Sequence, residues 1–373
     1  MSEAARRAQV AIVGGGAIGS AIAYFLTLER PEFDVTVIER DFTYTKASSA
    51  LSASSIRQQF SSPVNIRMSQ FGIEFFRRIG DILQEGDQRP DIGLVEPGYL
   101  YLASAAGAGQ LKLNHAIQAA HSVDVALMQP SALQARFPWL STDGIALGSL
   151  GRSGEGWFDG YSVLQAFRRK AIAQGARYLQ ASAVGFDRDA SGSRITGVQA
   201  RRDGRPERIA CDYAVNAAGP WAAAVASWAG IDLPVRARRR SVFSFRCPAR
   251  LVDCPLVIDT SGIWFRPEAE QFICGFAPAA HLDPDEPPLD VEYEAFDEFI
   301  WPTLAARVPA FEAIRMSGAW AGYYEMNTFD HNAILGLHPA CRNLYFAVGF
   351  SGHGLQQAPA VGRGIAELIR DGR

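Results

Sequence analysis

The stretch Gln9-Val-Ala-Ile-Val-Gly14-Gly-Gly16-Ala-Ile-Gly19 decides the fold of this chain. It opens with a short apolar run that ends at a glycine, which is typical of a buried parallel strand. Residues 17–28 are apolar and rich in alanine, and they predict a helix. Residues 35–38 are a β-branched run ending at Glu39, and they predict a second strand. Together these segments predict a strand–helix–strand unit.

The glycine spacing between this strand and helix has a chemical use. The first glycine permits a tight turn, the second lets the backbone approach a pyrophosphate, and the third allows close packing of helix and strand. The helix start offers free N–H groups and partial positive charge to the phosphates. An acid about 20 residues further on binds the ribose hydroxyl in such sites. We therefore predict a dinucleotide site, of NAD or FAD, that comprises Gly14, Gly16, Ala17, Ile18, Gly19, Glu39 and Arg40.

The length, charge and cysteine content of the chain limit the kinds of protein that it can be. The 373 residues suggest two domains, and the formal net charge of -3 does not indicate a nucleic-acid partner. The N-terminus lacks a signal-peptide pattern and no apolar run is long enough to span a bilayer. We expect a cytoplasmic or matrix-like compartment, with attachment to the inner face of a membrane as a variant. Five cysteines without a CxxC pair predict neither a disulfide framework nor a zinc site.

The rest of the chain alternates between helical and strand-like patterns. Helices are expected at 71–84, 106–120 and 163–174, the last with Ser162 as its N-cap, and at 357–370. Residues 177–215 and 235–276 indicate short strands separated by turns. A helix bent at Pro302 is expected over 291–308.

This order of elements predicts an α/β (α+β) fold. A Rossmann-like dinucleotide-binding domain would be interrupted by a substrate domain with a mixed or antiparallel β-sheet. We expect the dinucleotide-binding domain to be discontinuous, with residues 1–90, 150–232 and 325–373. The substrate-binding domain would then comprise residues 91–149 and 233–324.

A second glycine loop near the C-terminus favours a flavin. Residues 349–354 follow a predicted strand and precede the last predicted helix. Reduction of a flavin places negative charge near N1 and the C2 carbonyl, and a helix N-terminus stabilises an anion. NAD needs no such second device. From the residues alone, an ordinary glycine-rich turn remains an equal alternative.

With these motifs the chain resembles the D-amino-acid-oxidase, glycine-oxidase and sarcosine-oxidase superfamily of FAD-dependent oxidoreductases. The similarity covers essentially the whole chain and lies in four motifs in order: 14–19 with Glu39, 47–49, 215–221 and 349–354. Segments 56–61 and 352–359 are especially similar to a mitochondrial FAD-dependent oxidoreductase-domain group related to sarcosine and dimethylglycine dehydrogenases. The resemblance implies FAD as the cofactor.

The resemblance also implies which residues meet the cofactor. A serine-rich segment would line the pyrophosphate and the approach to the flavin, a backbone group at 184 would meet the adenosine, and the 219–221 turn would border the nucleotide cleft. The C-terminal loop would contact the isoalloxazine ring. The residues concerned are Ser48, Ser49, Ala50, Val184, Gly219, Trp221, Gly352, His353, Gly354, Leu355 and Gln356.

Four of the residues are expected to face the substrate. Arg57 matches an arginine that binds the substrate carboxylate in sarcosine oxidases, and a guanidinium fork suits a carboxylate. The alternative for Arg57 is a surface ion pair. Tyr324 is the candidate for a substrate-facing hydroxyl, with an aromatic core residue as the equal alternative. His353 is expected to hydrogen-bond at the flavin edge rather than act as a base, and Gln356 lies at the substrate end of its loop.

Three departures from sarcosine oxidases matter. Gln356 replaces a lysine that holds the carboxylate, which argues against a simple sarcosine-like substrate. Ile273 stands where another lysine activates oxygen, so we predict a dehydrogenase rather than a fast oxidase. No cysteine lies at 322–324, where some of these enzymes tether the flavin, and we therefore expect non-covalent FAD.

The function predicted is oxidation of the C–N bond of a small carboxylate-bearing amine or N-substituted amino acid, by hydride transfer to flavin N5. Electrons would leave to a quinone, an electron-transfer flavoprotein or, slowly, oxygen. One alternative is a 2-hydroxy-acid dehydrogenase on the same fold. Another is an FAD-binding assembly or scaffold protein with vestigial activity.

The arginines at 236 and 238–240 are interpreted as a solvated strand end, with a docking patch as the alternative.

Overall fold

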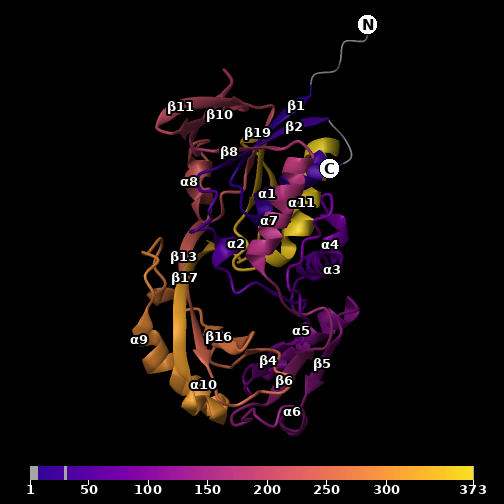
Figure 1. Ribbon diagram of the computed structural model, residues 1–373, viewed down its shortest axis with the longest axis vertical. Helices are drawn as coiled ribbons and strands as arrows, with labels where there is room; N and C mark the ends of the chain where they lie inside the picture. The colour runs from indigo at the N-terminus through magenta and orange to yellow at the C-terminus, as the bar shows by residue number, and fades with distance from the viewer. Residues whose placement is uncertain (1–6, 29–31, 373) are drawn as a thin grey trace.

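The computed structural model describes residues 7–28 and 32–372. A six-stranded sheet in the order β18-β19-β12-β1-β2-β8 forms its upper part (Figure 1). The strands β1, β2, β8, β12 and β19 are parallel, and only β18 is antiparallel to its neighbour. Their bounds are β1 Ala8–Val13, β2 Phe33–Glu39, β8 Arg177–Gln180, β12 Tyr213–Asn216, β18 Ile334–His338 and β19 Cys341–Val348.

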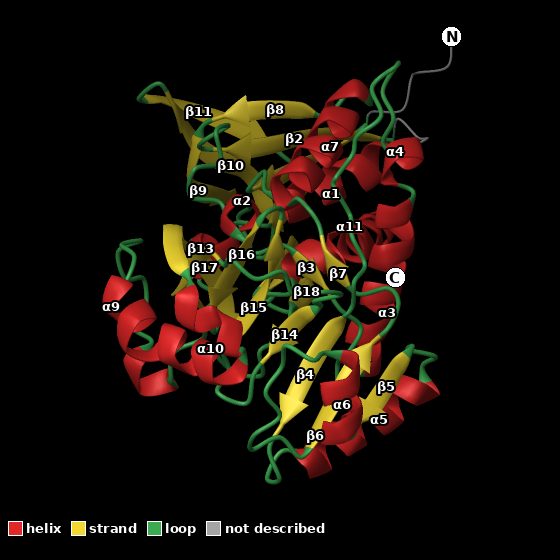
Figure 2. Cartoon of the chain, turned by 60° about the horizontal axis from the view of Figure 1, so that its bottom comes forward, coloured by secondary structure: helices red, strands yellow, loops and turns green. Residues whose placement is uncertain are grey.

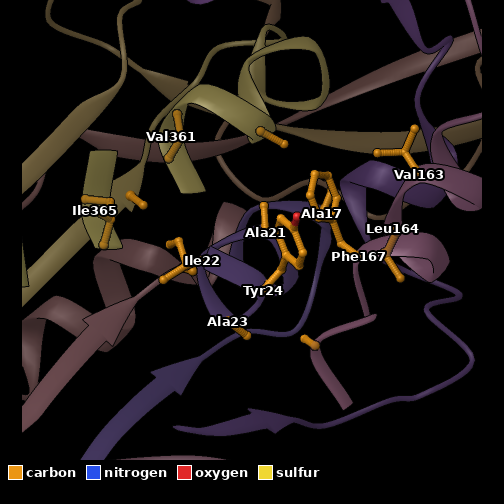
Figure 3. Packing of buried hydrophobic residues seen from close by; sticks show 14 of the residues in the cluster. Ala17, Ala21, Ile22, Ala23, Tyr24, Val163, Leu164, Phe167, Val361 and Ile365 are labelled. Atoms are coloured by element: carbon orange, nitrogen blue, oxygen red, sulfur yellow. The ribbon is translucent and has the colours of Figure 1, made fainter. Parts of the chain in front are cut away.

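Both faces of this sheet are covered, as the continuous apolar run of β1 predicts. Val10 and Ile12 point into a core shared with the helices α1 (Ala17–Thr27), α7 (Gly160–Ala173) and α11 (Gly354–Asp371). Figure 3 shows α1 between the other two helices, with Ala21 and Tyr24 of α1, Phe167 of α7 and Val361 of α11 among the buried residues of this core. Ala11 and Val13 point the other way.

The opposite face packs on a small three-stranded sheet. It has the order β11-β10-β9, with β9 Ser182–Arg188, β10 Ile195–Arg202 and β11 Arg205–Ala210. Its buried residues share a core with Ala11, Val13 and the short helix α8 (Ala222–Ser227). The layers are therefore helices, sheet and a second smaller sheet.

An eight-stranded mixed sheet forms the lower part, in the order β17-β13-β16-β15-β14-β4-β6-β5 (Figures 1 and 2). Its two longest strands, β13 (Val235–Arg246) and β17 (Arg315–Asn327), are antiparallel and rise toward the six-stranded sheet. The core of this part is rich in phenylalanine, including Phe243, Phe265 and Phe311. The other strands are β4 Tyr99–Ala103, β5 Val125–Met128, β6 Leu147–Gly151, β14 Leu256–Ile258, β15 Trp264–Glu268 and β16 Gln271–Gly275.

The predicted fold class is thereby confirmed: an α/β unit of Rossmann type stands beside a second, mixed sheet. The remaining elements are short or lie at the edges. They are α2 Ser48–Leu51, β3 Ser55–Ile56, α3 Pro63–Arg77, α4 Ile79–Ile82, α5 Ala108–Ala120, α6 Pro130–Arg136, β7 Gly156–Trp157, α9 Tyr293–Ala295 and α10 Trp301–Arg307.

Several local predictions were wrong in their boundaries. The N-cap of α7 is Asp159 and not Ser162: Oδ1 of Asp159 accepts hydrogen bonds from the backbone N–H groups of Tyr161 and Ser162, at 2.9 and 3.1 Å. An aspartate closes the helix start earlier than the serine because its carboxylate satisfies two free N–H groups at once. The helix expected at 71–84 begins at Pro63 and ends at Arg77. Over 291–308, a π-helical turn at Phe296–Ile300 precedes Pro302.

Two glycines of α11 offer a matched test of this packing. A β-carbon on Gly362 would lie 2.8 Å from the backbone of Ala21, whereas one on Gly364 would meet nothing within 4 Å. We expect Gly362→Ala to lower the free energy of unfolding by about 1–3 kcal/mol, because α1 and α11 must move apart. Gly364→Ala should be neutral or raise it by up to about 1 kcal/mol through helix propensity. Urea denaturation of both variants measures the difference, and equal effects would contradict this account.

Candidate functional site

A cavity of about 1150 Å³ extends between the two large sheets. It begins at the carboxyl ends of β1, β2 and β12, where open α/β sheets bind their ligands. Its other end is lined by residues of the eight-stranded sheet, among them Arg240, Trp264 and Tyr324. The volume exceeds the roughly 300–1,000 Å³ of a typical small-molecule pocket, so the cavity has room for an extended ligand.

The three glycines of the first motif serve different purposes. Gly14 has φ +101°, and a β-carbon there would overlap the carbonyl of Ala217. A β-carbon on Gly19 would overlap the carbonyl of Gly14. Gly16 differs, because a β-carbon there would meet only Oγ of Ser49, at 3.5 Å, and would project into the cavity that Gly16 lines. Gly14 and Gly19 are therefore required by the fold, whereas the space at Gly16 is left for a ligand.

The start of α1 and the end of β2 form one end of the cavity. The residues that line this end are Gly14, Gly16, Ala17, Ile18, Glu39 and Arg40. Gly19 lies in the first turn of α1, against the carbonyl of Gly14. Both oxygens of Glu39 accept backbone hydrogen bonds, from Gly15 at 2.8 Å and Asp41 at 2.9 Å. These bonds fix the carboxylate at the strand end. The Arg40 guanidinium lies 3.6 Å from the ring centre of Trp221, and both residues line the cavity.

The remaining nucleotide candidates are distributed along the same cavity. Ser48, Ser49, Gly219 and Trp221 line it, and Ser48 Oγ also donates a 2.6 Å hydrogen bond to the carbonyl of Tyr323 on β17. Ala50 lies in α2 but does not line the cavity. Val184 of β9 has an exposed side chain and follows residues 181–183, which line the cavity.

The second glycine loop, residues 349–354, lies at the far end. Gly352, Gly354 and Leu355 line the cavity, and the N-terminus of α11 opens there. The ring of Tyr324 packs on Gly352 so closely that a β-carbon at 352 would overlap it. Helix N-termini of α1 and α11 therefore meet the same cavity from its two ends, and each favours a negative group.

Arg57 contacts His353, which belongs to this loop, and Gln356, which follows it, although 296 residues separate Arg57 from His353. Arg57 donates from its backbone N–H to Oε1 of Gln356 at 2.9 Å and from Nη1 to the carbonyl of Gln59 at 2.9 Å. Its Nη2 lies 2.9 Å from Nε2 of His353, and its guanidinium lies 4.0 Å from the ring centre of Phe60. None of these three residues lines the cavity, but His353 and Gln356 are the sequence neighbours of Gly352 and Leu355, which do.

The contact with Arg57 determines the state of His353. A guanidinium can only donate, so Nε2 of His353 must accept, and the imidazole carries its proton on Nδ1. Burial and the adjacent charge of Arg57 lower the pKa of His353 to about 3. His353 is therefore neutral at physiological pH. Gln356 directs its side-chain oxygen toward the Arg57 backbone rather than toward the cavity.

Sequence reasoning missed the residues that surround Arg57. Glu155 is fully buried, and its carboxylate accepts hydrogen bonds from the backbone N–H groups of Gln58 and Gln59 and from Nε2 of Gln59, at 2.5, 3.1 and 2.8 Å. Burial raises the pKa of Glu155 to about 7. Tyr99 and Tyr101 stack on one face of β4, 5.4 Å between ring centres. The alternation of these tyrosines was visible in the sequence, but nothing in it placed them near Arg57.

The arginine cluster at 236–240 is not a solvated strand end. Arg240 is 9% exposed and donates from Nη1 and Nη2 to Asp283 at 2.8 Å each. Arg238 pairs with Asp285 at 2.9 Å, and Arg239 pairs with Glu292. The cluster thus binds the acidic segment 277–292 of its own chain. That segment also lines the cavity at 277, 288 and 289.

The described part of the chain contains neither a membrane-spanning helix nor a cluster of metal ligands. Within residues 7–28 and 32–372, no helix is long and apolar enough to cross a membrane. Over the same residues, no group of three or more metal-ligating side chains is found.

The chain matches a known family over nearly its whole length. The model of the DAO family, described as FAD dependent oxidoreductase, matches residues 9–368. The chain is 43% identical to FAD-dependent oxidoreductase domain-containing protein 1 of Xenopus laevis, over 98% of this chain and 80% of that protein. It is 23% identical to human mitochondrial sarcosine dehydrogenase, over 98% of this chain and 40% of that one.

Solved structures show the same fold. L-proline dehydrogenase from P. horikoshii superposes with a TM-score of 0.86 at 27% identity, covering 99% of this chain and 94% of that one. Glycine oxidase from Bacillus cereus superposes with a TM-score of 0.80 at 21% identity, covering 98% and 96%. The chain therefore belongs to the DAO family of FAD dependent oxidoreductases, and its cofactor is FAD. The free space at Gly16 and the two helix N-termini on one cavity fit this cofactor.

The glycine geometry predicts how two substitutions differ. Gly16→Val should leave the fold intact, because its side chain enters only the cavity, but the purified protein should be colourless and should not take up added FAD. Gly14→Ala should instead destabilise the protein without its cofactor, because the new β-carbon overlaps backbone. Visible absorbance and thermal unfolding of both apoproteins separate the two effects. A yellow Gly16→Val protein would contradict the assignment of this space to FAD.

Glu155 predicts a pH dependence of stability. Its pKa is higher in the folded protein, about 7, than the usual 4.5, so the folded state binds the extra proton between these values. The stability it contributes at low pH is lost as the pH rises from about 4.5 through 7, by up to about 3 kcal/mol. In Glu155→Gln this loss should be absent. The test is the free energy of unfolding of both apoproteins at several pH values, with the value for the variant subtracted from that for the wild type. A difference that does not change with pH would contradict the prediction.

Proposed function

We propose that this member of the FAD dependent oxidoreductase family oxidises the C–N bond of a small amine or N-substituted amino acid that carries a carboxylate. The observation that carries the proposal is the Arg57 guanidinium beside the glycine loop at 349–354, which forms no ion pair among the described residues. The nearby buried carboxyl group of Glu155 is hydrogen-bonded to Gln58 and Gln59 instead. The likeness to L-proline dehydrogenase, whose name specifies an amino acid with a secondary amine, supports the same class of substrate.

Arg57 is a cation that has no carboxylate within ion-pair distance among the described residues. Its hydrogen-bond partners are the carbonyl of Gln59 and the neutral ring of His353. A partly buried cation held in this way favours an anionic ligand, and a planar guanidinium binds a carboxylate well. The neutral imidazole orients the guanidinium without cancelling its charge.

Tyr324 and the substrate amine complete the proposed arrangement. The Tyr324 ring lines the cavity on the same side as Gly352, and burial raises the pKa of its hydroxyl, so it acts as a hydrogen-bond donor and not as a base. A neutral amine needs no general base before it is oxidised. When bound, FAD would supply the redox chemistry as the acceptor of the hydride. The protein's part is to orient the substrate and to exclude water.

We further propose that the enzyme is a dehydrogenase with non-covalent FAD. By the resemblance to sarcosine oxidases, Ile273 corresponds to a lysine that activates oxygen; here it is a buried, uncharged residue of β16. Segment 322–324, where some sarcosine oxidases tether the flavin, contains no cysteine. The electrons would then pass to a quinone or an electron-transfer flavoprotein.

An anaerobic titration tests the proposal. We expect the flavin absorbance of the holoprotein to bleach on addition of a secondary or tertiary amino acid, such as proline, sarcosine or dimethylglycine. Bleaching only by 2-hydroxy acids would identify the alternative dehydrogenase, and the admission of air would then test oxygen as acceptor. A flavin that no member of either class reduces would contradict the proposed function.

Arg57→Met separates charge from packing at the site. The variant should require a roughly 10- to 100-fold higher substrate concentration for half-reduction, since a charged hydrogen bond to the carboxylate contributes about 1.5–3 kcal/mol. Arg363→Met, on an exposed turn of α11, is the matched control and should titrate like wild type. If Arg57→Met bound the substrate as tightly as the wild type does, Arg57 would not be a ligand of the substrate carboxylate.

A further inference from the structure

Glu325 is a buried carboxyl group that no predicted role explains. It lies on β17, is 9% exposed and lines the cavity close to the loop at 349–354. This is the end of the cavity to which the second helix N-terminus, that of α11, is directed. A carboxylate would be an unfavourable neighbour for a cofactor that becomes more negative when it is reduced.

Hydrogen bonds hold Glu325 firmly against that loop. Its Oε2 accepts from the backbone N–H of Gly349 at 3.0 Å, and its backbone carbonyl accepts from the N–H of Ser351 at 3.0 Å. The N–H of Asn327 donates to Oγ of Ser351 at 3.0 Å. Three hydrogen bonds therefore join residues 325–327 of β17 to the loop at 349–354. Among the described residues, Oε1 of Glu325 has no hydrogen-bond partner.

No cation compensates this carboxyl group. On β13 its register partner is Ala237; the arginines on either side, Arg236 and Arg238, pair with Asp285. From the loop, His353 is neutral and bonded to Arg57. On its own strand Tyr324 packs on Gly352, and no basic group among the described residues lies within ion-pair distance of Glu325.

Burial without a counter-charge favours the neutral acid. A desolvated carboxylate with one backbone hydrogen bond is costly, and such a group keeps its proton instead. Burial raises the pKa of Glu325 to about 8 despite the bond from Gly349. The group therefore holds a proton at neutral pH. With Oε2 bound to a donor, Oε1 is the atom that carries the proton and has no acceptor in the protein.

We propose that Glu325 is a neutral carboxylic acid whose Oε1–H donates a hydrogen bond to the flavin at the loop 349–354. This rests on the placement of the flavin ring at that loop, but not on the identity of the substrate. An apolar site can keep a carboxylic acid neutral for such a purpose. When the acid ionises in alkaline solution, the donor is lost and a negative charge appears next to the ring, so both effects weaken the binding of FAD.

The test uses the holoprotein without any substrate. We expect the dissociation constant of FAD, measured by flavin fluorescence, to rise at least about tenfold between about pH 6.5 and pH 9.5 in wild type, the equivalent of one lost hydrogen bond. Glu325→Gln keeps a donor but cannot ionise, so its affinity should not change over this range. Glu325→Leu should bind FAD weakly at both pH values. Glu286→Gln, on the exposed segment next to β13, is the control and should behave as wild type.

The proposal fails if Glu325→Gln retains the alkaline loss of affinity or if wild type shows none. Should Glu325→Gln fold poorly, infrared spectroscopy of the wild-type holoprotein provides an independent measurement. A carbonyl band of a protonated buried acid should be present at about pH 6.5 and absent at about pH 9.5; a band absent at both would overturn the proposal. Because no substrate is added, neither result depends on the anaerobic titration of the proposed function.

Discussion

The close approach of three backbone segments at the end of β1 supports the whole architecture. The turn at Gly14 lies directly on the carbonyl of Ala217, which follows β12, and Gly19 of α1 lies on the carbonyl of Gly14. Only residues without a β-carbon permit these contacts. The contacts set how near α1 comes to the sheet, and through α1 they set the positions of α7 and α11. Since α11 begins at the second glycine loop, the two helix N-termini at the cavity share one structural origin.

The long strands β13 and β17 join this unit to the second sheet. They pair over most of their length, and they present Arg240 and Tyr324 to the cavity. The connection is reinforced where Ser48 of α2 donates to the carbonyl of Tyr323. The substrate end of the cavity is thus built on paired strands rather than on loops, which holds side chains more rigidly. The segment 277–292, which also lines the cavity, is a loop-rich exception. It is held by ion pairs between its acidic residues and four arginines of β13.

The charged groups that line the cavity or lie beside it follow a consistent pattern. Arg240 is neutralised by Asp283, and Glu39 is occupied by backbone donors. Arg57 is left with its charge, and His353 next to it is kept neutral by that charge and by burial. A ligand that carries a carboxylate would complete this pattern, since it supplies the counter-charge that Arg57 lacks. Glu325 is the reverse case, a potential anion without a cation, which burial keeps protonated.

Local sequence was enough to predict the strand–turn–helix of residues 9–28, the acid at 39, the glycine loop at 349–354 and hence the fold class. These features depend on glycine conformation, on hydrophobic periodicity and on spacing along one short segment, all of which are written in consecutive residues. Local sequence did not place Arg57 against His353, Glu155 against the backbone of Gln58, or Asp283 and Asp285 on the arginines of β13. Those contacts join residues 43 to 296 positions apart. Burial and charge pairing at such separations exist only after the sheets have packed, so the tertiary structure alone decided which side chains became the site.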